Sequence, residues 1–123
     1  MQSIFFKNIK NILLRNNIKK IINSKRFYVG RNNQVWLIST NKNKYIIKIY
    51  PFLKKNLKSR LFKEVNFLNI LEKNKLNSVP KTLDTNKKKN IAMYTFLPGR
   101  KIKKININYI NQCANFITKI NSF

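Results

Sequence analysis

The sequence contains no histidine, one cysteine and only three acidic residues among 123. Without histidine, His-assisted nucleophilic catalysis and His-ligated metal sites are excluded. The single Cys113 excludes an internal disulfide and a cysteine-based metal site. No apolar run is long enough to cross a bilayer, so we expect no membrane span.

The scarcity of acidic residues leaves a strongly basic chain, with 27 Lys and Arg and a formal net charge of +24. Such a charge usually indicates a nucleic acid or an anionic membrane surface as partner. The abundance of Lys, Asn and Ile is also typical of an AT-rich genome, which would scatter lysines over every surface. The lysine clusters are indeed spread along the chain, which favours genome composition over a binding surface as the origin of the charge. A nucleic acid partner remains the alternative explanation. They are Lys19-Lys20, Lys54-Lys55, Lys87-Lys88-Lys89 and Lys103-Lys104.

The chain is long enough for one domain with one hydrophobic core. Residues 1–26 are basic, free of acidic residues and amphipathic, a composition that organelle transit peptides share. Their apolar residues keep helical spacing up to the first strand, so we expect a structural helix over 1–26 and a cytoplasmic protein. These residues are Phe5, Ile9, Ile12, Leu13 and Ile21.

The remaining sequence predicts an α+β fold: a five-stranded antiparallel sheet with one packed helix, plus N- and C-terminal helices. β-branched and aromatic residues indicate the strands, and Gly, Asn and Pro mark the turns. Leucines at helical spacing, with Val65 and Phe62 beside them, make the central helix the clearest element. Strands are expected at 27–30, 35–39, 45–50, 82–83 and 91–96, the last two joined by a turn over 84–90. Helices are expected at 59–73 and at 105–120, the second close to where the sequence stops.

Two charged residues interrupt apolar patterns. Glu64 lies on the leucine stripe of the central helix, between Leu61 and Leu68, where burial of a carboxylate is costly. Lys48 lies in a strand that is apolar on both faces, which is typical of a central strand. Two alternatives do not require an ion pair. Lys48 would be solvated if its strand were at the edge of the sheet, and Glu64 would be solvated if the helix were slightly rotated. Because opposite charges compensate each other when they are buried, we predict that Lys48 and Glu64 form an ion pair.

These residues belong to an ordered series of short motifs. The series resembles the N-terminal lobe of the aminoglycoside phosphotransferase and choline kinase superfamily, which has a protein-kinase-like fold, over 27–120. Each motif is weak alone, and their order and spacing carry the resemblance. The motifs are 30–36 (GRNNQVW), 45–48 (YIIK), 60–64 (RLFKE), 79–83 (VPKTL) and 94–99 (YTFLPG).

The resemblance implies a nucleotide site for ATP or GTP. The turn at 30–33 would cover the phosphates, Val35 would pack on the adenine, and Lys48, held by Glu64, would contact the α- and β-phosphates. Residues 94–97 would be the hinge, with backbone groups of Thr95 and Leu97 bonded to the adenine edge. The family usually has an acidic residue where Thr95 or Phe96 stands. The implied nucleotide-binding residues are Gly30, Arg31, Asn32, Asn33, Val35, Lys48, Glu64, Thr95 and Leu97.

The family's large lobe normally supplies a His-x-Asp loop, a downstream Asn and an Asp that binds Mg²⁺. This sequence has no histidine, and Asp84 precedes the hinge, so we predict no catalytic and no metal-binding residue. The resemblance therefore implies a truncated or split enzyme that acts on a small hydroxylated molecule. It would have a nucleotide-binding lobe at 27–97 and the start of a large lobe at 98–123. Mg²⁺ would bind only if a large lobe were supplied.

Two other functions stay open. A small basic module could bind nucleic acid or an anionic surface with the kinase-like fold reused. A regulatory lobe could pair with a separate chain that carries the large lobe, through an apolar face near Tyr94, Leu97 and the last helix.

Overall fold

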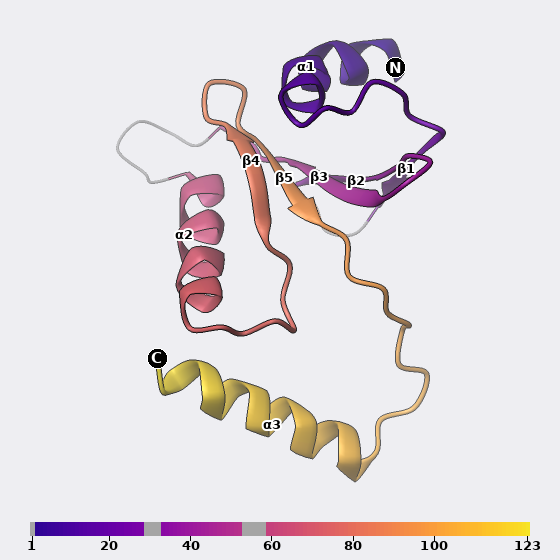
Figure 1. Cartoon of the computed structure of the whole chain (residues 1–123). Coiled ribbons are helices and arrows are strands. Elements are labelled where there is room, and N and C mark those ends of the chain that lie inside the picture. The colour runs from indigo at the N-terminus through magenta and orange to yellow at the C-terminus, as the bar shows by residue number, and fades with distance from the viewer. Residues whose placement is uncertain (1, 29–32, 53–58) are drawn as a thin grey trace.

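The structure is a computed structural model that describes residues 2–28, 33–52 and 59–123. It contains one antiparallel sheet with the strand order β1-β2-β3-β5-β4 and three helices (Figure 1). The predicted α+β class with a five-stranded antiparallel sheet is confirmed, and β3 is the central strand. The elements are α1 (Gln2–Arg15), β1 (Asn23–Phe27), β2 (Gln34–Ser39), β3 (Lys44–Ile49), α2 (Arg60–Lys73), β4 (Thr82–Asn86), β5 (Ile91–Thr95) and α3 (Ile107–Asn121).

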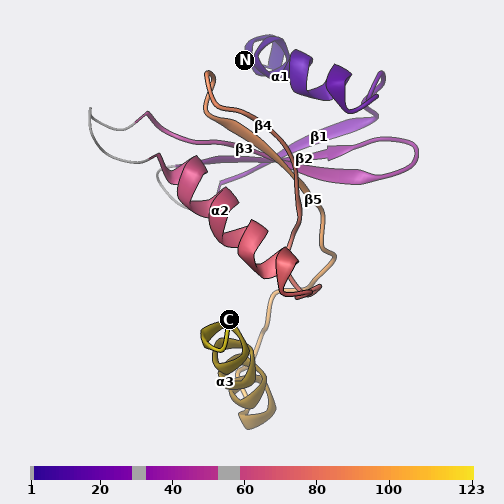
Figure 2. The same cartoon turned by 60° about the vertical axis from the view of Figure 1, so that its left-hand side comes forward.

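Helices cover both faces of the sheet. Successive side chains of a strand point to opposite faces, so β3 sends Ile47 to one face and Ile46 and Lys48 to the other. Helix α1 packs on the Ile47 face and α2 on the Lys48 face, and both views place the two helices on opposite sides (Figures 1 and 2). The N-terminal helix is thus a second packed layer and not a peripheral extension.

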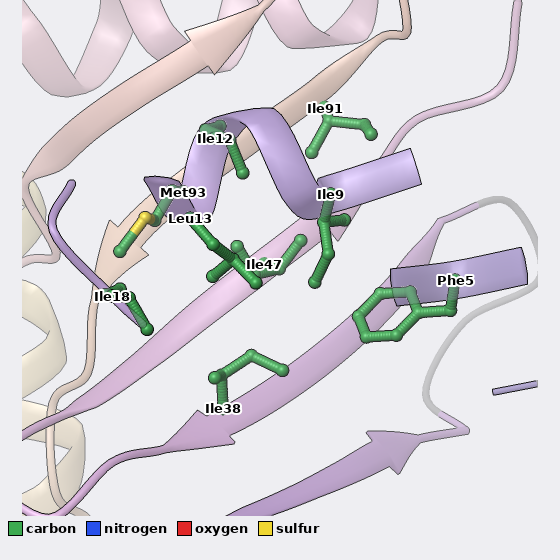
Figure 3. Packing of buried hydrophobic residues seen from close by; sticks show 9 residues of the cluster. All are labelled: Phe5, Ile9, Ile12, Leu13, Ile18, Ile38, Ile47, Ile91 and Met93. Atoms are coloured by element: carbon green, nitrogen blue, oxygen red, sulfur yellow. The ribbon is translucent and has the colours of Figure 1, made fainter. Parts of the chain in front are cut away.

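The core under α1 is formed by hydrophobic side chains from the helix, from the connection that follows it and from three strands (Figure 3). Ile9 on α1 and Ile38 and Ile47 on the sheet are fully buried. The ring of Phe5 stacks on Trp36 with 3.9 Å between the centroids. The buried residues of this cluster are Phe5, Ile9, Ile12, Leu13, Ile18, Ile38, Ile47, Ile91 and Met93.

The second core lies between α2 and the opposite face of the sheet. Its helix side confirms the predicted leucine stripe, since Leu61, Leu68 and Leu71 are buried. Phe62 is 42% exposed and so lies outside the core, and Leu57 falls outside the described residues. The sheet contributes Ala92, Tyr50 and Tyr94 to this core. Tyr50 follows Lys48 by two positions and Tyr94 follows Ala92 by two positions, so each tyrosine lies on the same face as its neighbour.

The expected helix over 1–26 was too long, and the first strand begins earlier than the predicted 27–30. Asn17 has a φ of 59°, and the Ile18 N–H donates to the Leu13 carbonyl, so α1 closes in a Schellman motif. Asn tolerates this left-handed conformation well. Ile21 has the helical spacing but is not in the helix. It lies in the connection between α1 and β1 and packs against the core from there.

The β4–β5 hairpin also differs from the prediction, because β4 continues through Asp84 to Asn86 and the turn is shorter than 84–90. The Asp84 carboxylate accepts hydrogen bonds from Arg15 at 3.0 and 3.1 Å and from Asn16 at 2.9 Å. These bonds join the end of α1 to β4. Local turn propensity at Asp84 is therefore overridden by a contact with a segment almost seventy positions away.

Helix α2 also ends in a Schellman motif, and here the left-handed residue is Lys75, with a φ of 59°. A residue with a Cβ is strained in this region and glycine is not, so Lys75→Gly is expected to raise the free energy of unfolding by about 0.5–1 kcal/mol. Urea denaturation measures the change. Lys73→Gly, inside the last turn of the same helix, removes the same charge and is expected to destabilise by about 1 kcal/mol. Equal effects from both variants would contradict the conformational explanation.

Helix α3 follows an extended segment after β5 and lies outside the two helical layers that cover the sheet (Figures 1 and 2). Asn106 caps its N-terminus by accepting the Tyr109 N–H. Most of its side chains are exposed, and Ile120 alone among them is half-buried, against the α2 cluster. None of the described helices has the length and apolar character needed to cross a membrane.

Candidate functional site

The predicted ion pair is present. Lys48 projects from the central strand β3 and Glu64 from α2, and the Lys48 Nζ lies 2.5 Å from the Glu64 Oε1. The side chains are 26% and 31% exposed, so the pair is half-buried and one side of it is open to solvent. A half-buried pair avoids most of the desolvation penalty of a fully buried one and leaves the ammonium group accessible to a ligand.

Two buried tyrosines complete a network behind this pair. The Tyr50 hydroxyl donates to the Glu64 Oε2 at 2.5 Å, and the hydroxyls of Tyr50 and Tyr94 are 2.6 Å apart. Because Tyr50 has one hydroxyl proton and gives it to the carboxylate, Tyr94 must be the donor to Tyr50. The proton order is therefore Tyr94 to Tyr50 to Glu64, and the two carboxylate oxygens have separate partners.

Both tyrosines are held in their neutral form. Burial, followed by the hydrogen bond to Glu64, raises the pKa of Tyr50 far above its ordinary value. Burial also raises the pKa of Tyr94, to about 12, although its bond to Tyr50 acts in the opposite direction. The Lys48 Nζ lies 5.6 Å from the centroid of the Tyr94 ring, within the range of a cation–π contact. The lysine thus contacts a carboxylate and an aromatic face at once.

The residues implied to surround the phosphates are only partly described. Gly30, Arg31 and Asn32 lie outside the described residues. Val35 lies on β2 directly opposite Lys48, so the two share one face of the sheet. Asn33 lies just before β2, and its Oδ1 is buried without a hydrogen-bond partner among the described residues. The structure thus brings Val35, Lys48 and Glu64 together.

The expected hinge follows β5. Thr95 is the last residue of that strand, and its N–H donates to the Lys81 carbonyl at 3.0 Å. Its Oγ1 accepts the Lys81 N–H at 2.9 Å. A backbone contact from Thr95 to an adenine would therefore have to use its carbonyl. Leu97 lies in the extended segment and is 41% exposed.

A cavity of about 480 Å³ lies on a different part of α2, between the helix and the β4–β5 turn. Leu61, Val65, Thr85 and Asn90 are among its lining residues, and neither Lys48 nor Glu64 is among them. The charged groups that suit phosphate chemistry thus lie outside this cavity, between β3 and α2. We place the candidate site there, at the ion pair.

Comparison with known families agrees with this geometry. Residues 24–123 match the model of the phosphotransferase enzyme family. The chain belongs to this family. A search of curated proteins finds no match.

The match to the phosphotransferase family covers both residues of the ion pair, Lys48 on β3 and Glu64 on α2. The family match begins at residue 24, which is in β1, so α1 lies outside it. Phosphotransferases need groups that bind metal, and the described part of this chain contains no cluster of three or more His, Cys, Asp or Glu side chains. What the site offers chemically is a fixed positive charge beside an apolar strand face.

Tyr50 and Tyr94 were missed as site residues by the sequence reasoning. The sequence predicts Tyr94 as the start of the hinge and gives Tyr50 no role. One available signal was the alternation that places Tyr50 two residues after Lys48, on the same face of the strand. No sequence signal indicated that the two hydroxyls would meet, because 44 positions separate them.

Proposed function

We propose that this chain is the nucleotide-binding lobe of a phosphotransferase that moves a phosphate from ATP or GTP to a small hydroxylated substrate. The observation that carries the proposal is the Lys48–Glu64 pair, half-buried on the sheet face that Val35 shares. The lysine would contact the α- and β-phosphates as a fixed charge, and Val35 would pack on the adenine. The nucleotide-binding residues we propose are Gly30, Arg31, Asn32, Asn33, Val35, Lys48, Glu64, Thr95 and Leu97.

Phosphoryl transfer requires positioning of both substrates and stabilisation of charge by a metal ion. We propose that a large lobe, on the same polypeptide or on a separate chain, supplies these groups. Support comes from α3, whose apolar side chains are exposed. Ile107, Ile110 and Ile117 are 53% or more exposed, and they follow one another at helical spacing. In contrast, Tyr94 is buried and cannot form part of such a surface.

The nucleotide proposal is tested by titrating the protein with ATP and with GTP and measuring heat or fluorescence. A charge-assisted contact to phosphate makes a substantial contribution to affinity, so Lys48→Met is expected to weaken binding about tenfold or more. Lys44→Met is the matched control, because Lys44 lies on the same strand and face and the same charge is lost. An equal loss in both variants would show only attraction of an anion to a protein of charge +24 and would contradict the proposal.

The polypeptide 1–123 is expected to be catalytically silent without a large lobe. A sensitive assay of phosphate transfer from ATP is expected to show no turnover that depends on Lys48. Turnover that is present in the wild type and lost in Lys48→Met would overturn this part of the proposal. The family match gives no support to the alternative of a basic module for nucleic acid or anionic surfaces. Such a module would bind with an affinity that falls steeply with salt.

A further inference from the structure

We propose that Tyr50 and Tyr94 are positioning residues that hold the Glu64 carboxylate in place, so that the Lys48–Glu64 pair is formed before any nucleotide binds. This inference rests on the proposed nucleotide site and adds two residues to it. Lys48 engages one carboxylate oxygen and Tyr50 the other. A carboxylate held at both oxygens has little freedom to rotate away from the lysine.

The tyrosines connect α2 to two strands at once. Tyr50 directly follows β3, while Tyr94 lies on β5, and β3 and β5 are neighbours in the sheet. Since Tyr94 donates to Tyr50 and Tyr50 donates to Glu64, the position of α2 is coupled to both strands through hydroxyl groups. Both tyrosines are 2% exposed, so water has little access to their hydroxyl groups.

The backbone that carries Tyr50 is itself fixed by Asn90. The Tyr50 N–H donates to the Asn90 carbonyl at 2.9 Å. The Asn90 side-chain amide donates to the carbonyls of Tyr50 at 3.0 Å and Pro51 at 2.9 Å. Asn90 is 3% exposed and has a φ of 59°, a conformation that Asn accepts more readily than most residues. The turn before β5 therefore determines where the Tyr50 ring is placed.

The first test is Tyr50→Phe, which keeps the ring and removes the hydroxyl. The affinity of this variant for ATP is measured under conditions in which the variant is fully folded. It is expected to fall about fivefold to thirtyfold, because the Glu64 carboxylate loses a hydrogen bond and no longer holds Lys48 in position for the phosphates. Tyr45→Phe is the matched control. Tyr45 lies on the same strand and packs against the α1 cluster on the opposite face. Its affinity is expected to stay within about twofold of the wild type.

The second readout needs no nucleotide. In the free protein, nuclear magnetic resonance of ¹⁵N-labelled lysine is expected to show a slowly exchanging Lys48 ammonium signal, lost in Glu64→Gln and weakened in Tyr50→Phe. Asn90→Gly keeps the backbone conformation but loses the amide bonds, and it is expected to weaken the same signal. An unchanged signal and unchanged affinity in Tyr50→Phe would overturn the inference. If the wild type binds no nucleotide but the signal responds to Tyr50→Phe, the proposed function fails and the positioning role stands.

Discussion

Ile9→Ala is expected to lower the free energy of unfolding by about 2–5 kcal/mol, the usual cost of removing a large aliphatic side chain from a closed core. Ile9 is 0% exposed and belongs to the cluster between α1 and the sheet (Figure 3). The cost arises from lost burial and from the cavity that α1 cannot close, because Arg15 and Asn16 tie its end to Asp84. Denaturation in urea, followed by circular dichroism, measures the change.

The same helix provides the control. Ile4 is 65% exposed, so Ile4→Ala removes the same atoms from a solvated position and is expected to change stability by less than about 0.5 kcal/mol. If Ile9→Ala were as mild as Ile4→Ala, the packing of α1 on the sheet would be contradicted. A larger loss would suggest that the sheet does not fold without this helix.

Helix α1 lies outside the segment that matches the family, so a large loss of stability in Ile9→Ala would show that the fold depends on a helix outside the family match. One of the two hydrophobic clusters nevertheless depends on it. Ile47 in the central strand is covered by α1, while Lys48, the next residue, points to the candidate site. The helix therefore supports the strand that presents the lysine, from the face opposite to the site.

The candidate ion pair could be predicted because it disturbed two clear patterns. A carboxylate on a leucine stripe and a lysine in an apolar strand are each unfavourable, and a pair resolves both. Strands β2, β3 and β5 and helix α2 could be predicted because their periods persist over several residues. Ser59, predicted to begin the helix, is its N-cap and accepts the Phe62 N–H.

The failures share a different cause. The end of α1 at Arg15 depends on one left-handed Asn17, which a periodicity argument cannot detect. The length of β4 depends on the pairing of Asp84 with a residue of α1. The tyrosine network depends on two strands being adjacent. In the last two cases the decisive partner is distant in the sequence, and local patterns carry no signal for that contact.

The tyrosine network also predicts a loss of stability at alkaline pH. The pKa of Tyr94 is raised to about 12 and that of Tyr50 is raised further, whereas tyrosines in the unfolded chain ionise near pH 10. Above about pH 10 the unfolded state therefore releases protons that the folded state keeps, so the free energy of unfolding falls as the pH rises. The slope is about 1.4 kcal/mol per pH unit for each tyrosine that stays protonated only when folded.

Urea denaturation at intervals between pH 9 and 12 tests this prediction when the wild type is compared with a Tyr50→Phe/Tyr94→Phe variant. Groups that titrate alike in both proteins cancel in the comparison, so the wild type is expected to lose stability relative to the variant by up to about 3 kcal/mol per pH unit. Tyr28→Phe is the control, because Tyr28 is 82% exposed and its removal should leave the slope unchanged. Parallel pH profiles for the wild type and the double variant would contradict the raised pKa values of Tyr50 and Tyr94 and the burial of their hydroxyl groups.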